Sequence, residues 1–450
     1  MNKITAIFSK NVVLPDAVTP ATLIIEDGRI ESIIRGRDSG QEGLAVTDYG
    51  DAYIMPGLID CHVHINEPGR TEWEGFETAT MAAAAGGITS LVDMPLNSSP
   101  VTVSVKALEE KREASRGKIY VNCGFWGGIV PGNSDEILPL IKAGVLGFKT
   151  FLCHSGIDEF PDTSLAELEK SLPVMADHGS PVLVHAEVEI KNNESAKPYG
   201  DEYAYRTWLN SRPESWENEA IRSLIALCRK YKVRTHIVHL SSAGALDMIR
   251  SAKSEGLPLT VETCPHYLYF FAESIPDKDT RFKCAPPIRE RENNRLLWEA
   301  VKDGTIDFIV SDHSPAPPEL KELSTGNLQR AWGGIASVQF TMPTVNTLML
   351  KENKSPEMIS AWMSKSVAGF LGLHHKGRIA PGADADLVVW RPYEKFEVTS
   401  SIIKFRHKVT PYEGQWLNGV VDETWVAGEK VYDRGQFTTG TAGRIINKTI

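Results

Sequence analysis

The sequence has few cysteines, and it has no long apolar run. Its cysteines lie singly at Cys61, Cys123, Cys153, Cys228, Cys264 and Cys284, with no Cys-x-x-Cys pair. This spacing excludes a dense disulfide framework and is typical of reduced thiols in a cytosol. No segment approaches the roughly eighteen apolar residues of a membrane span, and the first residues hold too short an apolar run for a signal peptide. We therefore expect a cytoplasmic protein with no membrane partner.

Runs of lysine and arginine are also missing. The net charge is -10 and both signs are interspersed along the chain, which argues against nucleic acid or an anionic membrane as a partner. The chain is long, with 450 residues, of which 42% are apolar and 24% charged. Such a chain can bury a large core, and its length suggests one large domain with a smaller companion.

The two ends of the chain resemble each other in pattern. The segment 23–30 has an Asp-Gly turn between β-rich flanks, and the segments 385–390 and 424–432 read as strand, turn and strand. We expect both ends to join one small β-sandwich domain. Residues 1–54 would form its N-terminal part, residues 376–450 its C-terminal part, and residues 55–375 the main domain.

Between these ends, strands that look buried alternate with helical patterns, which favours an α/β fold with parallel strands. Eight strands are predicted at Leu58–His64, Ser90–Met94, Ile119–Gly124, Leu146–Phe151, Pro181–His185, Arg234–His239, Leu259–Thr263 and Ile306–Ser311. Helices are predicted at Glu72–Ala85, Leu165–Ala176, Glu219–Tyr231, Gly244–Ser254 and Arg295–Asp303. Eight such units predict a TIM (β/α)8 barrel, with its site at the carboxyl ends of the strands.

Two histidines end the first of these strands. His62 and His64 are separated by Val63, and side chains alternate between the faces of a strand, so both rings project from the same face. Two imidazoles on one face can bind a metal ion, although a His-x-His pair alone is also compatible with ordinary polar residues at a strand end. Metal-assisted chemistry is the first hypothesis.

Further polar residues end the apolar runs of later strands, namely Lys149, His185, His239 and Asp312. Burying such groups without partners is costly, so the set indicates a site. The neutral amine of Lys149 can add carbon dioxide to give a carbamate that bridges two cations; the alternative is a buried lysine paired with a carboxylate. With the carbamate, the site holds two divalent ions and a hydroxide between them, which favours hydrolysis of an amide-like bond.

With these residues the chain resembles the cyclic-amidohydrolase branch of the amidohydrolase superfamily, which includes dihydroorotases, hydantoinases and allantoinases. The resemblance is greatest to the allantoinases, and it rests on the segments His62–Phe76, Asp93–Pro100 and Gly147–Gly156. It extends to Gly377–Leu387, which in this superfamily leads from the barrel into the small β domain. Nearly the whole chain is covered.

The resemblance implies a carboxylated Lys149 bridging two metals, with His62, His64 and Asp312 on one ion and His185 and His239 on the other. Asp312 is then the general base. The implied reaction opens the hydantoin ring of allantoin to give allantoate, in purine catabolism. The ligand types accept zinc, which is expected, and also cobalt, manganese or nickel. A homotetramer is a further expectation from the family.

The resemblance also suggests substrate-binding residues. Asn97 is expected near the ring or ureido group, with a turn residue as the alternative. His154 stands where hydantoinases carry a tyrosine that stabilises the oxyanion; the alternative is loop packing. Cys284 and Gly333 lie in segments that offer backbone groups to a cyclic amide.

Other positions narrow the substrate. Dihydroorotases place an arginine two positions after the second histidine, but here that residue is Asn66, which argues for a neutral ring. Arg70 lies close to Asn66 in the sequence, so a substrate with an acidic ring remains an alternative. The insertion between Lys191 and Trp216 would border the pocket, form an oligomer contact or be a solvated connection.

Two other functions remain open from the sequence. A hydantoinase or dihydropyrimidinase would use the same metal site as an allantoinase, because the residues that select the substrate in this branch lie in loops. A non-catalytic scaffold of the same fold is the remote alternative, and the complete ligand set argues against it.

Overall fold

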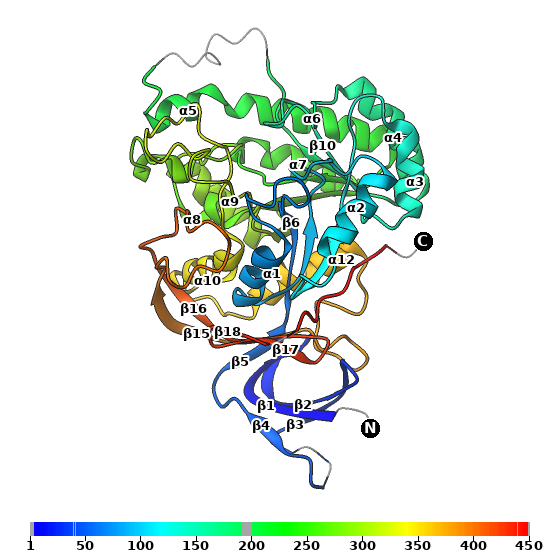
Figure 1. Ribbon diagram of the computed structural model, residues 1–450, viewed down its shortest axis with the longest axis vertical. Helices are drawn as coiled ribbons and strands as arrows, with labels where there is room; N and C mark the ends of the chain where they lie inside the picture. Colours follow the sequence, from blue (N-terminus) through cyan, green and yellow to red (C-terminus); the bar gives the residue numbers. More distant parts are fainter. Residues whose placement is uncertain (1–3, 39, 41, 191–199, 439, 449–450) are drawn as a thin grey trace.

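The computed structural model describes residues 4–38, 40, 42–190, 200–438 and 440–448. Figure 1 shows a large α/β body and, at one end of it, a smaller β body that carries the N-terminus. No helix in these described ranges is both long and apolar enough to cross a membrane.

The large body is a parallel barrel. Its strands are β6 (Leu58–Val63), β7 (Ile88–Asp93), β8 (Asn122–Phe125), β9 (Gly127–Gly128), β10 (Phe148–Phe151), β11 (Val182–His185), β12 (Thr235–Ile237), β13 (Leu259–Thr263) and β14 (Phe308–Ile309). They pair in two parallel runs, β6-β7-β8 and β9 through β14. A parallel bridge between Val63 and His313 joins the two runs at one seam. At the other seam, Trp126 alone separates β8 from β9, so these two count as one interrupted strand. The TIM barrel predicted from eight apolar runs is confirmed.

Helices cover the outside of the barrel (Figure 1). They are α1 (Phe76–Ala85), α2 (Val105–Ser115), α3 (Ile137–Lys142), α4 (Leu165–Asp177), α5 (Tyr205–Ser211), α6 (Glu214–Tyr231), α7 (Leu246–Ser254), α8 (Pro265–Tyr269), α9 (Arg291–Lys302), α10 (Thr341–Lys351), α11 (Met358–Ser360) and α12 (Ser366–Leu371). Each of the five predicted helices overlaps one of them. The first begins four residues later than predicted, at Phe76, because Gly75 has φ 105° and cannot continue a helix. The preceding residues are thereby left as a loop above β6.

The small body is one sheet built from both ends of the chain. Its strands are β1 (Ile4–Val13), β2 (Val18–Glu26), β3 (Arg29–Arg35), β4 (Val46–Asp48), β5 (Tyr53–Pro56), β15 (Leu387–Glu397), β16 (Trp416–Val426), β17 (Glu429–Asp433) and β18 (Gln436–Phe437). β5 pairs with β1 on one side and with β15 on the other, which connects the two ends. The sheet encloses its own apolar core, separate from the barrel core, with Ile7, Leu23, Ile54 and Val389 among its members.

The last described residues leave this sheet and return to the barrel. The backbone of Cys123 on β8 donates to Arg444 at 3.0 Å and accepts from Ile446 at 2.8 Å. The segment therefore adds backbone pairing to β8 where β8 diverges from β10. The domain boundaries at residues 54 and 375 stay a prediction.

Candidate metal centre and cavity

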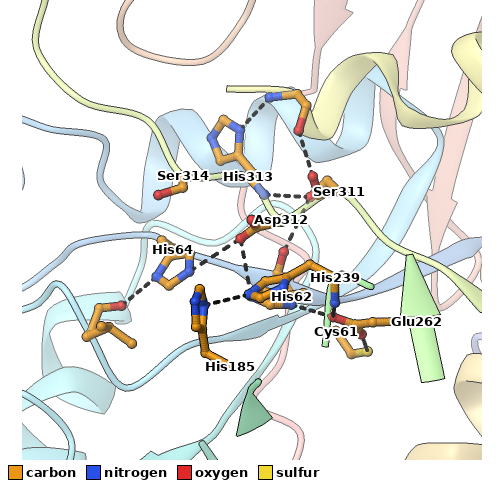
Figure 2. A network of polar contacts seen from close by, with 12 residues as sticks. Cys61, His62, His64, His185, His239, Glu262, Ser311, Asp312, His313 and Ser314 are labelled. Carbon is orange, nitrogen blue, oxygen red and sulfur yellow. Dashed lines mark hydrogen bonds and ion pairs between the residues drawn. The ribbon is translucent and has the colours of Figure 1, made fainter. Parts of the chain in front are cut away.

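The six predicted ligands converge at the carboxyl ends of the barrel strands. His62 lies on β6, Lys149 on β10 and His185 at the end of β11. His64 directly follows β6, whereas His239 and Asp312 lie in the short segments that follow β12 and β14. All six are buried. Figure 2 shows the imidazoles and the Asp312 carboxylate pointing toward one shared space. The barrel topology thus brings together residues that span about 250 positions of the sequence.

Asp312 lies against the first histidine pair. Its Oδ1 is 3.2 Å from His62 Nε2 and 3.6 Å from His64 Nε2. The donor atoms of these three residues all lie within 4.8 Å of one another, a spacing that one metal ion can span. His185 and His239 form the second pair, with His185 Nδ1 at 3.0 Å from His239 Nε2.

Each ring of the first pair is oriented by a contact on its far nitrogen. His64 Nδ1 lies 2.9 Å from the Leu96 carbonyl, and His62 Nδ1 lies 2.5 Å from Glu262 Oε1. Because these oxygens accept hydrogen bonds from the Nδ1–H groups, the Nε2 lone pairs of both rings face Asp312, as metal ligation requires.

The second pair is oriented by Glu187. Glu187 Oε2 lies 2.6 Å from His185 Nε2, so the Nδ1 lone pair of His185 faces His239. Glu187 is also paired with Arg212, whose Nη2 lies 2.5 Å from the same oxygen. Burial by itself would raise the pKa of Glu187, but the charges and hydrogen bonds of Arg212 and His185 lower it overall. Glu187 is therefore a carboxylate.

The backbone at two of the predicted ligands is in the left-handed region. His239 has φ 39° and Asp312 has φ 45°, values that residues with a side chain adopt at a cost of about 1–3 kcal/mol. Both residues lie just beyond a strand end, after Ile237 of β12 and Ile309 of β14. The left-handed backbone there turns the chain after the strand has ended.

Lys149 places its amine in the centre without a hydrogen bond. Its side chain is fully buried, and Nζ has no hydrogen-bond partner among the described residues. The ring centroid of Phe151 lies 4.9 Å from Nζ. Burial lowers the pKa of Lys149 to about 8, although Asp312 and Glu262 oppose this change. A neutral amine is therefore accessible near neutral pH.

The imidazoles are held in their neutral, metal-binding form. Burial is the largest cause that lowers the pKa of His62, His185 and His239, and the charge of Lys149 lowers each further. Neutral imidazoles and a carboxylate are the donor set that divalent metals with N and O ligands use, and the unpartnered amine of Lys149 lies beside them. The residues present fit such ions.

A cavity of about 390 Å³ opens above this centre. Three of the four predicted substrate-binding residues, Asn97, His154 and Gly333, line it. Asn97 Nδ2 donates to Asn66 Oδ1 at 3.2 Å, and His154 is exposed at the rim. Cys284 does not line the cavity. Its Sγ lies 3.2 Å from the Pro286 carbonyl.

The other residues considered for the substrate have partners in the protein. Arg70 donates to the Asn97 carbonyl at 2.7 Å and to Glu159 at 2.6 Å, and it is not among the cavity-lining residues. Asn66 is buried beside Asn97. Of the insertion at 191–216, Trp208 and Arg212 line the cavity, whereas residues 191–199 lie outside the described residues.

Sequence reasoning missed the residues behind the centre. Glu262 on β13 contacts both His62 and His236, and Asp60 accepts from the backbone N–H groups of His62 and Ser311. Burial raises the pKa of Glu262 to about 8 and that of Asp60 to about 7. The available signal was an acidic residue inside a strand that otherwise reads as buried.

Comparison with known proteins agrees with this architecture. The sequence pattern of the amidohydrolase family matches residues 53–431. Allantoinase from Arabidopsis thaliana is 45% identical, over 98% of this chain and 90% of that protein. Allantoinases from Streptomyces avermitilis and Saccharomyces cerevisiae are 44% and 43% identical, covering 98% and 95% of this chain and 98% and 95% of their own lengths. L-hydantoinase (dihydropyrimidinase) from Arthrobacter aurescens superposes with a TM-score of 0.92 at 29% identity, over 99% of this chain and 100% of that one.

Proposed function

The chain belongs to the amidohydrolase family, and we propose that it hydrolyses the hydantoin ring of allantoin to give allantoate, in purine catabolism. The observation that carries the proposal is the similarity to allantoinases of plant, bacterial and fungal origin along nearly the whole chain. The buried cluster of histidines, lysine and aspartate at the barrel mouth supplies the chemistry that such a reaction needs.

Two divalent metal ions are part of this proposal. His62, His64 and Asp312 would hold one, His185 and His239 the other, and a carbamate on Lys149 would join them. Such ions, zinc above all, act as Lewis acids that polarise an amide carbonyl and lower the pKa of water. The unpartnered Nζ of Lys149 supports the carbamate, because a neutral amine with no hydrogen bond is available to carbon dioxide.

Asp312 would move the proton. Hydrolysis adds a water oxygen to the ring carbonyl carbon and breaks the carbon–nitrogen bond. One water proton goes to the departing ureido nitrogen, and the other is released when the new carboxyl group ionises. The Asp312 carboxylate takes the proton of the attacking water and delivers it to the departing ring nitrogen. Its position beside His62 and His64, at the floor of the cavity, supports this role.

The walls of the cavity would orient the ring. We propose that Asn97 and His154 contact the substrate through their side chains, and Gly333 through its backbone. The side chain of Cys284 points elsewhere, and its carbonyl accepts from Trp208 Nε1 at 3.1 Å, so any contribution from Cys284 would be its backbone N–H. The engagement of Arg70 by Glu159 supports a neutral substrate rather than an acidic ring.

Hydantoinase or dihydropyrimidinase activity is the second candidate, favoured by the TM-score of 0.92 to an enzyme of that name. The purified protein, loaded with metal and bicarbonate, should be assayed with allantoin, hydantoin, dihydrouracil and dihydroorotate. The proposal expects the highest kcat/KM for allantoin. A higher value for hydantoin or dihydrouracil would replace it with the second candidate, and no turnover of any cyclic amide would favour a scaffold.

We also propose a homotetramer that works in the cytoplasm. Sedimentation equilibrium tests the first statement and cell fractionation the second. A monomer in sedimentation, or enrichment of the protein in an organelle fraction, would contradict them.

A further inference from the structure

Arg212 lines the cavity and is not one of the six predicted ligands. It lies between α5 and α6, next to Trp208, which lines the same wall. Apart from Lys149 at the metal centre, two other basic side chains line the cavity, and both are already engaged. Lys283 Nζ donates to the carbonyls of Gln329 and Ala331 at 2.9 and 2.6 Å, and Arg330 is largely exposed and pairs with Glu322.

The guanidinium of Arg212 is held firmly on one edge. Nε lies 3.0 Å from Glu187 Oε1, and Nη2 lies 2.5 Å from Glu187 Oε2, which is a bidentate pair. Trp208 and Trp216 lie near the guanidinium, with ring centroids at 5.6 and 5.9 Å from its central carbon. These contacts fix the plane of the group before any ligand arrives.

The remaining edge of the guanidinium is free to bind. Arginine has five N–H donors, and Nε and Nη2 account for three of them. Among the described residues, Nη1 has no hydrogen-bond partner, whereas Nε and Nη2 contact Glu187 and Cys153. The arrangement therefore offers two N–H groups from a rigid, cavity-lining side chain.

The charge of this group favours a neutral acceptor. Glu187 is fully buried and balances the charge of Arg212, so the pair as a whole carries little net charge toward the cavity. A carbonyl oxygen can accept one of these N–H groups, and it does not need a full positive charge to do so. The same Glu187 oxygen contacts His185, so the guanidinium lies only two hydrogen bonds from the predicted metal ligands.

We propose that Arg212 determines substrate specificity by donating from Nη1 to the ureido carbonyl oxygen of allantoin. This contact requires the ring substituent to extend toward Arg212 and Trp208 when the ring amide lies at the metal centre. Hydantoin has the same ring without the ureido group and makes no such contact. This inference rests on the proposed function and adds to it the residue that separates allantoin from an unsubstituted ring.

The test compares Arg212→Lys with wild type on two substrates. Lysine keeps a positive charge beside Glu187 but has no planar fork, so it cannot hold that carboxylate at two points and also donate from a fixed position to the substrate. Loss of a charge-assisted hydrogen bond predicts a fall in kcat/KM for allantoin of about 10- to 100-fold. For hydantoin, kcat/KM should change less than about threefold. The matched control is Arg229→Lys, because Arg229 makes the same bidentate pair with Glu255 on the outside of the barrel and should affect neither substrate.

Metal analysis separates recognition from support of the metal centre. If Arg212 acted only through Glu187 and His185, the Arg212→Lys protein would lose metal, and its kcat/KM would fall in parallel for both substrates. That result, or an unchanged kcat/KM for allantoin, would overturn the proposal. Retained metal with a selective loss on allantoin supports it.

Binding provides a test that does not depend on turnover. In an Asp312→Asn background, calorimetry should show the Kd of allantoin weakened at least about tenfold by Arg212→Lys, with that of hydantoin nearly unchanged. An equal change in Kd for allantoin and hydantoin would contradict the contact between Arg212 and the ureido group. If wild type binds allantoin through Arg212 but does not hydrolyse it, the proposed function fails while the Arg212 contact stands.

Discussion

Replacing Lys149 by methionine should stabilise the metal-free protein while it abolishes hydrolysis. The amine is fully buried without a hydrogen-bond partner among the described residues, and burial lowers its pKa from 10.5 to about 8. A shift of that size corresponds to a cost of about 3 kcal/mol for carrying the ammonium into the folded protein at neutral pH. Methionine has a similar length and no charge to bury, so the variant avoids this cost.

The gain in stability should depend on pH with a defined sign. The folded pKa of Lys149 lies below its unfolded value, so the unfolded chain binds more protons between about pH 8 and pH 10.5. In that window the contribution of Lys149 makes wild type more stable as the pH rises. The difference from Lys149→Met is therefore about 3 kcal/mol below pH 8, and it shrinks to under about 1 kcal/mol at pH 10.

Urea denaturation of chelator-treated protein in bicarbonate-free buffer measures this difference at both pH values. Lys106→Met is the control, because Lys106 is exposed on α2 and its replacement should change the stability little. A Lys149→Met protein that is less stable than wild type at neutral pH would show that burying the Lys149 ammonium does not destabilise the fold. A stability difference that does not decrease by pH 10 would contradict the lowered pKa of Lys149.

The remaining predictions concern the neighbours of Lys149. Asp312→Asn should lower kcat at least about a hundredfold, since it removes the proton carrier, and metal analysis shows how much of the loss comes from the weakened ligand set of the first ion; near-normal turnover would leave the base unassigned. Glu262→Gln should weaken the metal affinity about 10- to 100-fold by loosening His62, which competition with a chelator measures; unchanged affinity would remove Glu262 from the support of the centre. Asn97→Ala should raise KM for allantoin about tenfold in steady-state assays, and an unchanged KM would assign Asn97 to the loop alone.

Sequence patterns anticipated the parts of the protein that depend on local order. Strands such as Val182–His185 are short apolar runs that end on a polar residue, and parallel barrel strands carry their sites at those ends. The TIM barrel, the sheet from both ends of the chain and the convergence of the six residues could therefore be predicted. Helix α2 could not, because its sequence is mostly charged and offers only a weak apolar face.

What escaped prediction depends on contacts between strands distant in sequence. Glu262 contacts His62 across 200 positions, and Arg212 reaches Glu187 from a loop outside the barrel. Such contacts follow from strand register and from loop paths, which local patterns do not encode. Cys284 was expected to offer a backbone group to the substrate, which stays a prediction; its side chain contacts the Pro286 carbonyl.

The most direct test of the account is metal analysis coupled to turnover of allantoin. Protein purified with bicarbonate should hold two divalent ions per chain, lose activity when a chelator removes them, and regain it when metal and bicarbonate are returned together. Lys149→Ala treated in the same way should regain neither the ions nor the activity. Undiminished hydrolysis of allantoin by the metal-free protein would contradict the account.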